Sequence, residues 1–186
     1  MPSPIVHSAA GYVIYRFSKR NLPEVWKKRA GPVSFLLILT LIFSMMPDLD
    51  AIAGLITGDF GKYHNNGTHS LIVGLLVAVT IALALSRKRR VEFLPWFLIV
   101  FFSYGSHILL DFFTWGGRGV MLFWPLSIER YQSGVSLFYG VRWGDGLFSI
   151  NHLWTLATEV TFVLLLLLGV YLAEIRTRRV SDRENT

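Results

Sequence analysis

The chain has 186 residues, of which 53% are hydrophobic and 16% are charged, and its mean hydropathy is +0.48. Soluble domains carry about a quarter charged residues, so this composition favours an integral membrane protein. A formal net charge of +6 would suggest nucleic-acid binding in a soluble protein. In a membrane protein, basic residues collect on cytoplasmic loops and beside anionic headgroups, so no nucleic-acid partner is expected. The sequence contains no cysteine, which excludes disulfides, thiolate metal sites and thiol nucleophiles.

The first element in chain order is a short stretch from Ile5 to Phe17, which alternates small and aromatic residues and ends at a basic cluster. It predicts either a short fifth membrane span or an interfacial helix. A signal peptide has its basic cluster before its apolar stretch. The order here is the reverse, so residues 1–20 are expected to belong to the mature protein.

Four long apolar segments follow, each near the ~20 residues that a helix needs to cross about 30 Å of hydrocarbon. Residues 30–47, 70–86 and 93–110 contain no Asp, Glu, Lys or Arg, and residues 153–173 contain only Glu159. The sequence therefore predicts an all-α, polytopic transmembrane helical bundle of four long spans plus a short N-terminal helix. No internal repeat is visible, so residues 1–186 are expected to form a single membrane-embedded domain.

The basic residues predict the orientation of this bundle. Most of the 18 lysine and arginine residues lie in residues 16–29, 87–90 and 176–183, whereas residues 48–69 and 114–152 hold few. The positive-inside rule therefore predicts a cytoplasmic C-terminus and places the two poorly charged connections on the outer side. Residues 112–150 are also rich in aromatic residues and glycine, which suggests an aromatic cap at the level of the headgroups.

The histidines and several carboxylates fall at the outer ends of the predicted helices. The N-terminal histidine joins them if its helix runs inward toward its basic end. Random placement would distribute them over both faces. These residues are His7, Asp48, Asp50, His64, His69, His107, Asp111 and His152.

Asp48 and Asp50 follow Pro47, where a helix is expected to break, so both carboxylates can turn toward a common cation. The alternative is a solvated helix end or a cap. His64 and His69 flank a turn sequence and are too far apart for one helical face, so His64 must be presented from the turn.

Thr68 or Ser70 can cap the helix that follows this turn. A lone interfacial histidine is usually only a polar residue, but two histidines beside two aspartates favour metal ligation.

His107 and Asp111 are four residues apart and share a helix face, so both can bind one metal or the carboxylate can orient the imidazole. The alternative is a hydrogen bond between helices. Glu159 lies seven residues after His152 and faces the same way, about two turns deeper. It could ligate a metal, orient a ligand or act as a general base.

Taken in order, His7, the Pro-Asp-Leu-Asp step at 47–50, residues 64–70, residues 106–114 and the Trp-Pro at 124–125 resemble a known bacterial inner-membrane family. This is the family of LexA-regulated, membrane-bound, metal-dependent hydrolases, and the likeness covers roughly residues 5–126. The sequence departs from the family in the Asn-Asn-Gly at 65–67, where the family has arginine and one fewer residue.

The resemblance implies an inner-membrane enzyme. It implies metal ligation by His7, Asp48 or Asp50, His69, His107 and Asp111. A more distant likeness, to zinc-dependent phospholipase C and related single-strand nucleases, implies several zinc ions and cleavage of phosphoester bonds.

These expectations combine into a metal-dependent hydrolase of the inner membrane that holds one to three divalent ions, zinc by preference, near the outer face. The substrate would be a phosphoester or other ester of a lipid or lipid-linked molecule, with Arg118 or Arg130 available for a phosphate. Asp50 and Glu159 are the candidate catalytic bases. The predicted metal ligands are His7, Asp48, Asp50, His64, His69, His107 and Asp111.

Two alternatives belong to other functional classes. A divalent-metal transporter would need polar residues through the whole membrane thickness. A non-enzymatic assembly protein would need no cluster of ligands.

Overall fold

The computed structural model describes residues 2–22, 24, 33–58, 63–89, 92–141 and 149–184. Helices dominate it, and four of them are long and apolar enough to cross a membrane, namely Phe35–Gly54, Leu71–Lys88, Phe93–Phe112 and Asn151–Thr177. This confirms the predicted all-α bundle of four long spans. The elements are α1 (Pro4–Asn21), α3 (Val33–Met45), η1 (Met46–Leu49), α4 (Asp50–Thr57), η2 (Gly67–His69), α6 (Leu71–Arg89), α7 (Phe93–Phe112), β1 (Thr114–Trp115), β2 (Phe138–Tyr139) and α8 (Asn151–Glu184).

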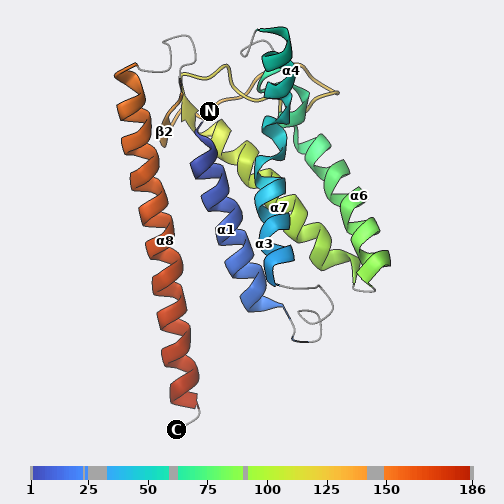
Figure 1. Cartoon of the computed structure of the whole chain (residues 1–186), viewed down its shortest axis with the longest axis vertical. Helices are drawn as coiled ribbons and strands as arrows, with labels where there is room; N and C mark the ends of the chain where they lie inside the picture. The colour runs from blue at the N-terminus through green and yellow to red at the C-terminus, as the bar shows by residue number, and fades with distance from the viewer. Residues whose placement is uncertain are drawn as a thin grey trace.

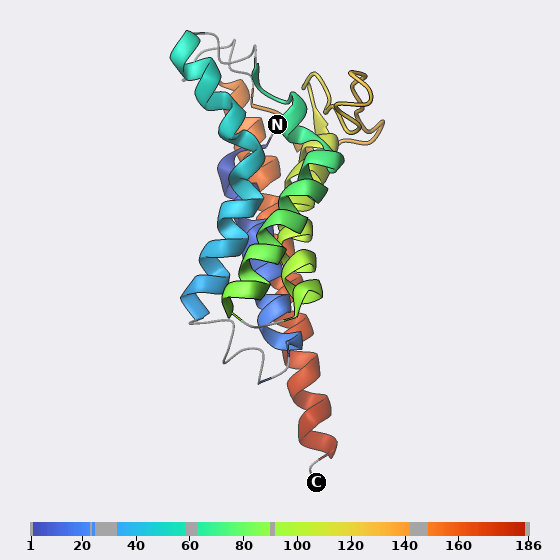
Figure 2. The ribbon, with the colours of Figure 1, turned by 90° about the vertical axis from the view of Figure 1, so that its right-hand side faces the viewer.

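The helices lie side by side and alternate in direction (Figures 1 and 2). The starts of α1, α6 and α8 and the ends of α3 and α7 therefore lie at one end of the bundle, which also carries α4 and the strands. The opposite end carries basic residues, described at Arg16, Lys19, Arg20, Arg87, Lys88 and Arg176. Of the basic residues that predicted the orientation, Lys27, Lys28, Arg29, Lys62, Arg90 and Arg142 lie outside the described residues.

Helix α1 lies inside the bundle, packed against α3, α7 and α8 (Figure 1). Ser3 caps it by accepting a hydrogen bond from the Ile5 amide at 3.3 Å, and Pro4 occupies a first-turn position, where its missing N–H costs nothing. Its 18 residues extend about 27 Å at 1.5 Å per residue. The helix runs alongside the spans and not across their ends, but among the described residues it is not one of the four helices long and apolar enough to cross a membrane.

The first long helix breaks at Pro47, as the sequence predicts. Proline lacks an amide hydrogen and cannot continue the α-helical ladder. The chain instead forms the 3₁₀ segment η1 between α3 and α4. Residues Asp48 and Asp50 therefore stand at a bend at the end of the bundle.

Helix α7 is the centre of the hydrophobic core. Its Trp96, Val100, Tyr104 and Ile108 are buried between α3 and α6. Tyr104 packs so close to α6 that a Cβ on Gly74 would lie 2.8 Å from its ring. Helix α7 is therefore packed on both sides. The same packing holds the polar residues near the end of this helix in place.

Residues 113–141 cover the end of the bundle that carries the bend. β1 and β2 pair in parallel, with Thr114 opposite Phe138 and Trp115 opposite Tyr139. The large exposed residues of this segment include Trp115, Phe123, Trp124, Leu126 and Ile128. This end of the bundle therefore carries exposed aromatic and apolar side chains, while residues 142–148 of the predicted cap lie outside the described residues.

Candidate metal centre

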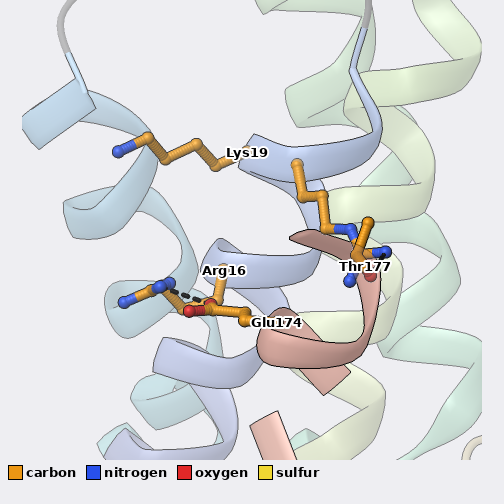
Figure 3. Close-up of a pocket in the computed structure, with 5 residues that line it drawn as sticks. Arg16, Lys19, Glu174 and Thr177 are labelled. Carbon is orange, nitrogen blue, oxygen red and sulfur yellow. Dashed lines mark hydrogen bonds and ion pairs between the residues drawn. The ribbon is translucent and has the colours of Figure 1, made fainter. Parts of the chain in front are cut away.

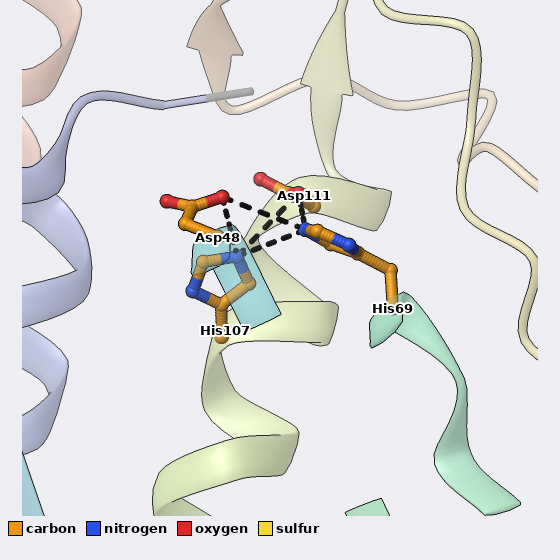
Figure 4. A group of neighbouring side chains, drawn as sticks. All are labelled: Asp48, His69, His107 and Asp111. Atoms are coloured by element: carbon orange, nitrogen blue, oxygen red, sulfur yellow. Dashed lines mark hydrogen bonds and ion pairs between the residues drawn. The ribbon is translucent and has the colours of Figure 1, made fainter. Parts of the chain in front are cut away.

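Five residues from four elements meet at one end of the bundle, and Figure 4 shows four of them, Asp48, His69, His107 and Asp111. His7 lies in the first turns of α1, Asp48 in η1 and His69 at the end of η2, while His107 and Asp111 lie one turn apart on α7. The three imidazoles are fully buried, and Asp111 is 4% exposed. The structure thus brings together five of the seven residues predicted to bind metal.

The ligand atoms of this group are packed within the span of one coordination sphere. One such atom from each of Asp48, His69, His107 and Asp111 lies within 4.8 Å of all the others. His69 Nε2 is 3.2 Å from His107 Nε2 and 3.2 Å from Asp111 Oδ2. His107 Nε2 is also 3.3 Å from Asp48 Oδ1.

His7 completes the group from the side of α1. Its Nε2 is 3.5 Å from Asp111 Oδ1, and its ring stacks on that of His107 with centroids 3.7 Å apart.

The hydrogen bonds on the far side of two rings decide which nitrogen carries the proton. His107 Nδ1 lies 2.8 Å from the Ser44 carbonyl, which can only accept, so Nδ1 donates. His69 Nδ1 lies 3.2 Å from Asp50 Oδ2, a carboxylate that likewise accepts. If both rings are neutral, as metal ligation requires, their Nε2 atoms present lone pairs to each other and to two carboxylates. That arrangement is repulsive unless a cation lies among them.

Several polar atoms of the group are buried without a hydrogen-bond partner. They are both ring nitrogens of His7, both carboxylate oxygens of Asp48 and Asp111, and His64 Nε2. Burying an unpaired carboxylate costs several kcal/mol, on the order of the penalty for an isolated charge in protein. A divalent cation among one ligand atom each of Asp48, His69, His107 and Asp111 would give the two carboxylates the positive partner that they lack. The nitrogen and oxygen donors fit zinc.

A second, smaller group adjoins the first and shares His69. It consists of Asp50, His64 and His69, one ligand atom of each lying within 4.8 Å of the others. His64 Nδ1 is 2.9 Å from Asp50 Oδ1, and the Thr68 hydroxyl donates to Asp50 Oδ2 at 2.8 Å. His64 Nε2 points toward the first group, 3.7 Å from Asp48 Oδ1. Asp50 and His64 therefore lie beside the five residues as orienting partners or as ligands of a second ion.

The carboxylates around His69 raise the pKa of its imidazole. Burial alone would lower the pKa of His69, but the neighbouring carboxylates of Asp111, Asp48 and Asp50 outweigh burial and raise the pKa well above 6.5. The site therefore attracts positive charge in general, whether a proton or a metal ion.

The turn that presents His64 is held by Arg130. Asn65 adopts a φ of +59°, in the left-handed region that asparagine tolerates. Arg130 donates to the Asn65 carbonyl at 2.9 Å, to the Gly119 carbonyl at 3.1 Å and to Asn66 Oδ1 at 2.5 Å. Its guanidinium thus joins the turn to the covering segment and is engaged in these contacts, while Arg118 is exposed.

Two predicted residues lie apart from both groups. Glu159 is 2% exposed, and its carboxylate accepts hydrogen bonds from the Ser3 amide at 2.5 Å and from the Ser3 hydroxyl. It thereby joins α8 to the start of α1. His152 belongs to neither group. A catalytic role for Glu159 stays a prediction, and its contacts indicate a role in helix packing.

Some of the residues that shape the site were not singled out by sequence. The Ser44 carbonyl carries no sequence signal, because any residue at that place on α3 offers the same acceptor. Ser70 caps α6 by accepting from the Ile72 amide at 3.1 Å, as predicted, whereas Thr68 instead holds Asp50.

Comparison with known proteins identifies a membrane family. Residues 1–179 match the family of the YdjM inner membrane protein. The chain is 36% identical over 100 residues to inner membrane protein YbcI of Escherichia coli strain K12, a match that covers 52% of this chain and 57% of that protein. No solved structure matches the chain. Neither name states an activity.

Proposed function

The chain belongs to the YdjM inner membrane protein family, and from this premise we propose that it is a metal-dependent hydrolase of a lipid or lipid-linked ester. The observation that carries the proposal is the set of buried imidazole and carboxylate groups whose ligand atoms lie within 4.8 Å of one another, several of them without a hydrogen-bond partner. Such a set is costly in a structural protein and useful in an enzyme that binds a cation.

The five residues His7, Asp48, His69, His107 and Asp111 would hold the first divalent ion, with zinc the best fit to their donors. Asp50 and His64 offer ligands for a second ion beside it. A bound ion would polarise the phosphoryl or acyl oxygen and lower the pKa of a water molecule.

Groups of this chain would orient the metal ligands and supply a base for that reaction. The Ser44 carbonyl and Asp50 fix the rings of His107 and His69 in the orientation that directs Nε2 inward. Asp50 is our candidate for the base, since its carboxylate is partly exposed and is held by Thr68 and His64.

The position of the centre favours a lipid substrate. It lies at the end of the bundle that carries the exposed aromatic residues of 113–141, and such residues are typical of the level of the lipid headgroups. The basic residues lie at the opposite end, so the positive-inside rule predicts that the centre faces the outer side of the inner membrane and that the C-terminus is cytoplasmic.

A transporter is less well supported. In the described part of the chain, the buried histidine, aspartate and glutamate side chains are His7, His69, His107, Asp111 and Glu159, all toward the same end of the bundle. A pathway for ions would need such groups through the membrane thickness.

The test is metal content and hydrolysis in the protein purified in detergent. We expect the wild type to retain zinc and to hydrolyse bis(p-nitrophenyl) phosphate or a short-chain phospholipid, and His107→Ala with Asp111→Ala to lose both. His152→Ala is the matched control, because it removes a histidine outside both groups and should change neither. Equal metal in all three proteins would contradict the metal centre. Metal without hydrolysis of any ester would contradict the enzyme and leave a metal-binding membrane protein.

A further inference from the structure

A cavity opens between α1 and α8 at the end of the bundle opposite the metal centre (Figure 3). Its volume is about 300 Å³, and five residues line it, Arg16, Lys19, Arg20, Glu174 and Thr177. The volume is sufficient for a phosphate group with part of a glycerol backbone. No role in the proposed hydrolysis draws on these residues.

The lining of this cavity carries more positive than negative charge. Arg16 pairs with Glu174 and donates to the Tyr12 hydroxyl at 2.8 Å. Arg20 donates to the Thr177 hydroxyl, and the Lys19 ammonium lies 5.9 Å from the centre of the Tyr15 ring. Among the described residues, neither Lys19 nor Arg20 has a carboxylate partner. These two cations therefore carry charge that no described carboxylate neutralises, and this charge can attract an anion.

The surface beside the cavity is apolar. Phe17 is 70% exposed on α1, and Leu168, Tyr171 and Leu172 are exposed on α8. An anion with a hydrocarbon tail could place its charge at Lys19 and Arg20 and lay the tail along these residues. A free anion would use only the charges.

Helix α8 also has limited support at this end. It packs mainly against α1 and β2, and β2 lies at the other end of the bundle. Near the metal centre, Glu159 and Ser3 join α8 to α1. At the cavity the corresponding contacts are Arg16 with Glu174 and Arg20 with Thr177, so a ligand bound there would bridge the two helices.

We propose that this cavity binds the phosphate headgroup of an anionic phospholipid of the leaflet at the basic end, and that the lipid fastens α8 to α1. The shared chemistry of the candidate ligands is a negatively charged phosphate. The apolar surface beside the cavity selects the lipid over the free ion.

The experiment titrates dioleoyl-phosphatidylglycerol into the full-length protein in detergent micelles and follows the midpoint of thermal unfolding. Dioleoyl-phosphatidylcholine and inorganic phosphate are titrated in parallel. We expect phosphatidylglycerol to raise the midpoint and the other two to have little effect. Lys19→Gln with Arg20→Gln should raise the half-saturating lipid fraction about 30-fold, and Lys19→Gln alone about fivefold, from the strength of one basic residue at an anionic surface.

Arg87→Gln with Lys88→Gln is the matched control, because it removes two exposed cations at the same end of the bundle that do not line the cavity. We expect it to leave the titration unchanged. An equal loss in both double variants would refute a defined site in favour of diffuse surface charge. Stabilisation by phosphatidylcholine would refute the charge selectivity, and full stabilisation by inorganic phosphate would refute the lipid. None of these readouts depends on the metal centre.

Discussion

Replacing Gly11 with alanine tests whether close packing of α1 on α3 is what brings His7 to the metal centre. Gly11 is buried where the two helices touch. A Cβ there would lie 2.5 Å from the Ser44 hydroxyl and 2.9 Å from the Thr40 carbonyl oxygen. The serine side chain can rotate away, but the carbonyl belongs to the backbone of α3 and cannot move without the helix.

The geometry sets the size of the effect. Ordinary contacts begin at 3.4 Å, so the alanine is about 0.5 Å too close to the carbonyl and α1 must move by at least that amount. Overpacking of this kind costs about 1–3 kcal/mol. His7 lies one helical turn from Gly11, and a metal site tolerates displacements of only about 0.5 Å. We therefore expect zinc affinity to fall about 10- to 100-fold, as when an orienting partner of a ligand is lost.

The assay is thermal unfolding in detergent together with zinc titration of Gly11→Ala. Gly105→Ala on α7 is the matched control, because its Cβ would meet no atom within 4 Å. It should be neutral or stabilising by about 0.5–1 kcal/mol, as expected for alanine in a helix. If Gly11→Ala kept both the unfolding midpoint and the zinc affinity of the wild type, the link between this contact and the metal centre would be wrong.

Three further predictions follow from the site and the topology. Asp50→Asn should lower zinc affinity about 10- to 100-fold and abolish hydrolysis, because it removes the carboxylate that orients a ligand; unchanged zinc binding and turnover would exclude that role. Glu159→Gln should keep the metal and the hydrolysis, since an amide oxygen still accepts from the Ser3 amide; loss of hydrolysis with the metal retained would instead support the predicted catalytic base. Single cysteines replacing Ile128 and Lys88 should react with a membrane-impermeant maleimide from opposite sides, and labelling from the same side would overturn the orientation.

The amino-acid sequence by itself predicts the spans and much of the candidate site. A long apolar segment is driven into lipid by its own side chains, whatever its neighbours are, so four spans could be predicted from local composition. The helix break at Pro47 and the shared face of His107 and Asp111 are also local, because they follow from proline chemistry and the helical repeat.

Only the tertiary structure decides how these pieces meet. The pattern of Ile5 to Phe17 fits a span or an interfacial helix, and the close contact between Gly11 and α3 places it in the bundle. Periodicity put Glu159 on the face of His152, yet its partner is Ser3, 156 residues away in sequence. Such contacts depend on which helices pack together. Hydropathy and periodicity describe one segment at a time and carry no information about its neighbours.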